Sequence, residues 1–112
     1  PLVSVDDARG PRHATARDRL ALWYTHCVLD EGQRLLSAGD TPGATRQFER
    51  GLLHEPLAEP LHRALIAAHL QAGERAEALR SYRRCAELLQ RSLGVEPSAE
   101  TQALAERARS GG

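Results

Sequence analysis

Several residue types are scarce or missing from this 112-residue sequence. It contains no lysine and no methionine, only 4% of its residues are aromatic, and it has two cysteines. Without lysine no Walker-type phosphate loop can form, because that loop needs a Lys to reach the phosphates. The low aromatic content argues against a β-sandwich. No run approaches the roughly 18 apolar residues that cross a bilayer, so we expect neither nucleotide hydrolysis nor contact with a membrane.

The charges of the chain cancel. Fifteen basic residues, all arginine, face fifteen acidic ones, for a formal net charge of zero. A free-standing nucleic-acid binder needs a basic face, so we expect no direct, base-specific nucleic-acid contact by this chain. Cys27 and Cys85 lie far apart without a CxxC motif, which indicates neither a disulfide framework nor a zinc site. We therefore expect a cytoplasmic protein and no cofactor.

Apolar residues recur three, four and seven positions apart, which is typical of amphipathic helices. Glycine and proline residues such as Gly39, Pro56 and Gly73 separate the helical segments. The pattern predicts helices over residues 15–38, 41–53, 57–72, 74–92 and 98–109. On the first helix, the residues predicted to face inward are Leu20, Tyr24, Cys27, Val28 and Leu35.

The same pattern predicts the division of the chain. Residues 1–14 carry no sustained periodicity and are predicted to be a flexible linker. Residues 15–109 form the one helical domain, and 110–112 a disordered tail. The fold class is therefore all-α, with about five helices in one bundle.

The sequence repeats itself with a shift of 34 residues. The shift places Gly39 on Gly73 and Ala44 on Ala78, at positions where small residues let helices approach closely. It also places the aromatic Phe48 on Tyr82. In length and in its Gly, Ala and aromatic positions this unit resembles the tetratricopeptide repeat. The resemblance implies a bundle of helical hairpins.

The resemblance also implies a ligand groove, because the first helix of each tetratricopeptide repeat lines one. We predict a partner-binding groove lined by His26, Leu29, Asp30, Gln33, Arg63, Ala67, Leu70 and Gln71. The alternative interpretation is that the first or the fifth helix of the chain itself fills this groove.

A second candidate surface is basic. It consists of arginines on the second helix of each repeat: Arg46, Arg50, Arg80, Arg83 and Arg84. They could contact phosphates. The alternative, a solvated or protein-contacting face, is favoured because acidic residues are interleaved at helical spacing, such as Glu77 three residues before Arg80.

No catalytic or metal-binding residues are predicted. Glu59 and His62 have the i, i+3 spacing of half a di-iron motif, but the other ligands are missing, and we interpret them as a surface pair. His69 is expected to pack between helices and Cys85 to be a core thiol, since neither has a reactive setting. Trp23 is either a second packing contact or an exposed interface anchor.

Three strings resemble a more specific family: EPLHRAL at 59–65, AGERAEALRSYRRC at 72–85 and LGVEPSAET at 93–101. They are similar to the bacterial transcriptional activator domain of antibiotic regulatory proteins of the SARP type, over about residues 17–107. The resemblance implies a tetratricopeptide-like signalling module, not an enzyme, that contacts protein partners or other domains of a transcriptional regulator, with RNA polymerase as one candidate. The alternative is a tetratricopeptide adaptor outside transcription. A homo-oligomer is left open.

Overall fold

The chain folds into α-helices only. The computed structural model describes residues 15–111, and in that range it contains five helices and no strand. The helices are α2 (Ala16–Ser37), α3 (Thr41–His54), α4 (Glu59–Gln71), α5 (Arg75–Leu93) and α6 (Ala99–Ser110). Every boundary lies within two residues of its predicted position, and the all-α prediction is confirmed. The predicted linker at 1–14 lies outside the described residues.

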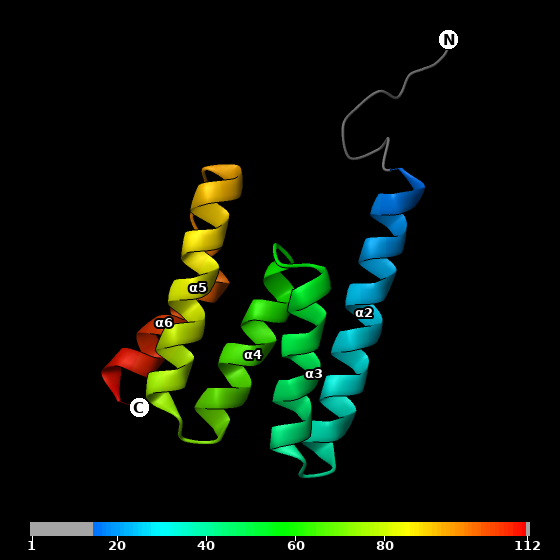
Figure 1. Cartoon of the computed structure of the whole chain (residues 1–112). Helices are drawn as coiled ribbons and strands as arrows, with labels where there is room; N and C mark the ends of the chain where they lie inside the picture. Colours follow the sequence, from blue (N-terminus) through cyan, green and yellow to red (C-terminus); the bar gives the residue numbers. More distant parts are fainter. Residues whose placement is uncertain (1–14, 112) are drawn as a thin grey trace.

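The helices form two hairpins, α2–α3 and α4–α5, that stand side by side, with α6 packed on the second one (Figure 1). The turns of the two hairpins have the same structure. Gly39 and Gly73 take positive φ angles of 83° and 77°, which glycine adopts without steric cost. The amides of Asp40 and Glu74 each donate to the carbonyl five residues earlier, at 2.8 Å in both turns. The predicted shift of 34 residues is thus present in the backbone.

Two apolar clusters share the central helix α4. The first joins α2, α3 and α4 around Phe48 and Leu65, and the second joins α4, α5 and α6 around Ile66 and Ala78. The first cluster is tight at Gly32, where a Cβ atom would meet the Phe48 ring at 2.1 Å. These two clusters fix the second hairpin on the first and α6 on the second.

Two predicted core positions of the first helix are wrong. Tyr24, Val28 and Leu35 pack against the first cluster, but Leu20 is 63% exposed and Cys27 is exposed. The reason is that α2 contacts only α3 and α4 among the described helices, and both lie on the Val28 side. The opposite edge of the predicted apolar stripe faces solvent.

His62 also differs from its prediction as a surface residue. It is 1% exposed, and its Nε2 donates to the carbonyl of Pro56 at 2.8 Å, in the turn between the hairpins. Its Nδ1 has no hydrogen-bond partner among the described residues. Burial lowers the pKa of this imidazole, so the neutral form is the one that packs here. By contrast, His69 is half-buried as predicted and lies 2.9 Å from the Glu74 carboxylate across the α4–α5 turn.

Candidate protein-interaction surfaces

The three family-like strings meet where α6 begins. The Glu59 carboxylate on α4 accepts hydrogen bonds from the Ser98 amide at 2.7 Å and from the Thr101 hydroxyl at 2.5 Å. Arg63, one turn further along α4, lies 3.4 Å from both the Ser98 and the Thr101 hydroxyl oxygens. Thr101 is completely buried. We call Glu59, Arg63, Ser98 and Thr101 the α4–α6 contact.

The electrostatics of this contact favour an ionised Glu59. Burial on its own would raise the pKa of Glu59, but the hydrogen bonds from Thr101 and Ser98 and the nearby Arg63 outweigh it and lower that pKa. The charged carboxylate is therefore the form that holds α6. The first and third strings serve the fold here, by tying one helix of the domain to another.

The far end of α6 is fixed as well. Arg75, at the start of α5, donates from Nε to the carbonyl of Ala108 at 2.8 Å, one of the terminal carbonyls of α6. The Arg109 guanidinium lies 5.7 Å from the centre of the Tyr82 ring, within range of a cation–π contact. Because both ends are held, α6 forms a fixed cover over the second hairpin.

The predicted groove is divided between covered and open parts. On α4, Arg63 is engaged in the α4–α6 contact, Leu70 packs against the second apolar cluster, and Ala67 is half-buried, whereas Gln71 is exposed. These contacts correspond to the alternative in which the fifth helix covers the α4 side.

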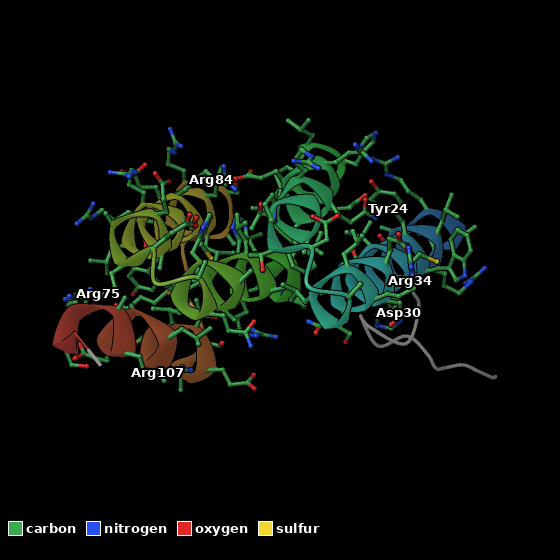
Figure 2. The ribbon with its side chains drawn as sticks, turned by 90° about the horizontal axis from the view of Figure 1, so that it is seen from below. Tyr24, Asp30, Arg34, Arg75, Arg84 and Arg107 are labelled. Carbon is green, nitrogen blue, oxygen red and sulfur yellow. The ribbon has the colours of Figure 1, made fainter. Side chains whose placement is uncertain are left out.

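On α2 the predicted groove residues are more open. His26, Asp30 and Gln33 are exposed, while Leu29 packs against the first apolar cluster. In Figure 2, Asp30 and Arg84 lie on opposite sides of the molecule. The predicted groove and the predicted basic surface are therefore on different faces.

The basic surface lies where α3 and α5 run next to each other. Arg84 on α5 reaches across to Glu49 on α3, with Nη2 and Oε1 3.0 Å apart. Arg46 and Arg50 line a shallow pocket of about 410 Å³ together with Leu53, which is 83% exposed. We call these five residues the α3–α5 face.

The two remaining predicted arginines lie on α5. Arg80 pairs with Glu77 at 2.5 Å, and Glu77 lines the same pocket, so Arg80 lies at the edge of the α3–α5 face. Arg83 is exposed. The predicted interleaving of Glu77 with Arg80 is confirmed, whereas the cross-helix pair of Arg84 was not foreseen.

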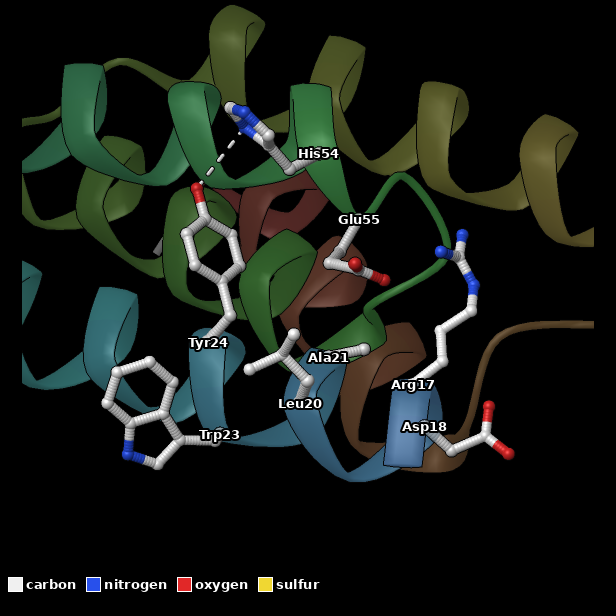
Figure 3. A pocket seen from close by; sticks show the side chains of 8 residues that line it. All are labelled: Arg17, Asp18, Leu20, Ala21, Trp23, Tyr24, His54 and Glu55. Atoms are coloured by element: carbon white, nitrogen blue, oxygen red, sulfur yellow. Dashed lines mark hydrogen bonds between the residues drawn. The ribbon is translucent and has the colours of Figure 1, made fainter. Parts of the chain in front are cut away.

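A further pocket, of about 390 Å³, lies between the first half of α2 and the end of α3 (Figure 3). The Tyr24 hydroxyl lies 3.3 Å from Nδ1 of His54 at this pocket, and Trp23 points away from His54. Trp23 is 63% exposed, so of the two predicted roles it has that of an exposed residue. Sequence reasoning missed the pocket because it joins residues 30 positions apart.

The chemistry of the titratable groups gives no reactive centre in the described part of the chain. Burial raises the pKa of the Cys85 thiol to about 11, so it remains protonated and unreactive, as expected for a core thiol. Between residues 15 and 111 no group of three or more His, Cys, Asp or Glu side chains is placed to hold a metal ion. None of the helices described is long and apolar enough to span a membrane.

Such a helical, hairpin-built fold belongs to the class of regulatory domains that work by contact, and comparison with known families specifies it. Residues 3–109 match the family described as the bacterial transcriptional activator domain. The match covers nearly the whole chain, so the chain belongs to this family, and the resemblance drawn from its sequence is confirmed. No curated protein and no solved structure gives a significant match.

Proposed function

We propose that the chain is a non-catalytic interaction module of a bacterial transcriptional regulator, working in the cytoplasm. Its role is to contact other domains of the regulator or the transcription machinery, RNA polymerase included. Membership of the activator-domain family supports the link to transcription. The unreactive, buried Cys85 supports a role without catalysis.

The α3–α5 face is the observation that carries the proposal. Leu53 exposes 83% of its surface at the centre of this face, and Arg46 and Arg50 flank it. An exposed apolar anchor with arginines around it is the composition that protein interfaces favour. A solitary surface leucine of this kind contributes nothing to the fold of the chain itself.

The charge of the face indicates the chemistry of the partner. Its three arginines, Arg46, Arg50 and Arg84, are offset by a single acid, Glu49, which is already paired with Arg84. The remaining positive charge attracts an acidic surface and accelerates its association. The apolar Leu53 favours a protein partner over a phosphate backbone, which offers no apolar surface outside its grooves.

The test is binding to purified bacterial RNA polymerase holoenzyme, measured by biolayer interferometry at two salt concentrations. We expect the double variant Arg46→Glu with Arg50→Glu to bind about tenfold more weakly or worse, as when interface arginines are removed. The control is Arg107→Glu on α6, an exposed arginine on another helix (Figure 2), which should bind like the parent chain.

Two results would contradict the proposal. If the parent chain does not bind the polymerase, contact with the transcription machinery is excluded as its role. If the double variant and the control bind equally well, the α3–α5 face is not the contact surface. Binding to random-sequence DNA that the double variant loses would instead assign the face to phosphates.

A further inference from the structure

The first half of α2 carries a second apolar stripe that faces away from the core. Ala16, Leu20, Trp23 and Cys27 follow one another at intervals of four, three and four residues, the spacing of a coiled-coil seam. All four are exposed, and Leu20 and Trp23 each expose 63% of their surface. We call these four residues the α2 stripe. Exposed apolar residues aligned at this spacing mark a surface that another helix can cover.

The 34-residue repeat shows what this stripe is used for elsewhere in the fold. The shift places Cys27 on Leu61 of α4 and Glu31 on Leu65. Leu61 and Leu65 are completely buried, because this face of α4 packs against the preceding hairpin. The α2 stripe therefore occupies the position that the fold itself uses for helix packing, and none of the described helices lies on it.

The stripe is apolar over only part of the helix. Where α4 continues with Leu65 and Ala68, α2 has Glu31 and Arg34, whose side chains pair with Nε and Oε1 3.0 Å apart. A further hairpin stacked as α4 stacks on α3 would run along the whole helix and cover both charges, which is costly. A helix that overlaps only the first two-thirds of α2 would leave Arg34 at the edge.

We propose that the α2 stripe is a dimer interface, in which α2 pairs in antiparallel orientation with α2 of a second copy of this chain. In this pairing a two-fold axis passes close to Trp23, so that each Trp23 faces that of the partner. Leu20 then lies opposite the partner's Cys27, and Ala16 opposite the partner's Asp30. An isologous contact of this kind closes on itself as a dimer.

Charge complementarity favours this occupant. Arg17 lies beside the stripe near the start of α2, and the antiparallel pairing brings it opposite the partner's Glu31. Asp30 comes close to the N-terminal end of the partner's α2, where the helix dipole favours a negative charge. Parallel pairing would instead set each of these charges against its own copy, which is unfavourable.

The first test is the mass of the chain in solution as a function of concentration, by sedimentation equilibrium. We expect reversible association from 12.3 kDa to a dimer. The variant Trp23→Ser should weaken it by about tenfold or more, because it removes the central aromatic anchor. The control Leu22→Ser changes a residue that is 58% exposed but off the stripe, and it should associate like the parent chain.

Circular dichroism of both variants must show unchanged helicity, which separates loss of the interface from loss of the fold. A parent chain that stays monomeric at the highest concentration reached would overturn the proposal. It would assign the stripe to a different partner. Equal association of Trp23→Ser and the parent chain would overturn it too.

The second test checks the orientation by disulfide formation. The variant Leu20→Cys should form a covalent dimer under mild oxidation, because the introduced thiol of each copy lies opposite the partner's Cys27. Within one chain these two positions are two helical turns apart, about 10 Å, too far for a disulfide. The control Leu22→Cys should remain uncrosslinked. Rapid crosslinking of the parent chain through its own Cys27 would indicate parallel helices and contradict the proposed geometry.

Discussion

The two ends of the helical array are finished in different ways. At the C-terminal end, α6 covers the second hairpin and is fixed to it by Glu59 at one end and by Arg75 at the other. At the N-terminal end, the equivalent packing face of α2 is uncovered and exposes Trp23. Helical hairpins stacked in a row need such end covers, because each hairpin buries its apolar face only against a neighbour. The chain therefore supplies its own cover at one end and leaves the other for a partner.

The contrast can be broken most strongly at the equivalent positions Leu65 and Glu31. Leu65→Ala should lower the free energy of unfolding by about 2–5 kcal/mol, because Leu65 is completely buried and its loss leaves a cavity. Glu31→Ala should change it by only about 0.5 kcal/mol or less, because the ion pair with Arg34 is exposed. Urea unfolding of both variants measures the difference. Similar losses would show that the two faces are not equivalent.

A smaller effect is expected from the α4–α6 contact. Thr101→Val keeps the shape of the side chain but removes the hydroxyl that donates to Glu59, and should cost about 1–3 kcal/mol. Amide hydrogen exchange in α6 should accelerate while exchange in α3 stays unchanged. The control Thr45→Val removes a hydroxyl that donates only to the Pro42 carbonyl, outside this contact. Unchanged protection of α6 in Thr101→Val would mean that apolar packing alone holds the helix.

The buried His62 should make the stability of the fold depend on pH. Its folded-state pKa lies below the unfolded value near 6.5, so the folded state binds fewer protons there. Stability should be highest above that value and should fall as the pH drops from it towards the folded-state pKa. His62→Asn, which can still donate to the Pro56 carbonyl, should flatten this slope in urea titrations between pH 7.5 and about 5. An unchanged slope would place the proton uptake elsewhere.

The smallest effect on stability is expected on the α3–α5 face. Arg84→Glu breaks the pair with Glu49, but both side chains are nearly half exposed, so the loss should stay within about 1 kcal/mol. Helicity by circular dichroism should be unchanged. A large loss of helicity would show that this arginine supports the stacking of the hairpins rather than contacts with a partner.

Much of the fold could be predicted from the sequence because its signals are local. The turn glycines Gly39 and Gly73, and the small residues Ala44 and Ala78, determine hairpin geometry within one repeat. The shift of 34 residues made them recognisable twice in one chain. For the same reason the helix boundaries were predicted within two residues.

The surfaces were harder to predict because they depend on contacts between distant residues. The hydrogen bond from Thr101 to Glu59 joins positions 42 residues apart, so the two strings resembled a family signature without revealing their joint structural role. His62 was misplaced because its burial depends on the turn at Pro56. Leu20 and Cys27 obeyed the helical spacing, but spacing alone does not tell whether a helix covers the outer edge of a stripe.

The fluorescence of Trp23, the single tryptophan of the chain, tests most directly whether the N-terminal end of the array is uncovered. At low protein concentration, with the helices intact by circular dichroism, acrylamide should quench Trp23 almost as easily as a free tryptophan derivative. Raising the concentration should shift its emission to shorter wavelengths and protect it from quenching. A tryptophan that is already shielded in the dilute, folded monomer would contradict the account, because the chain would then cover both of its ends.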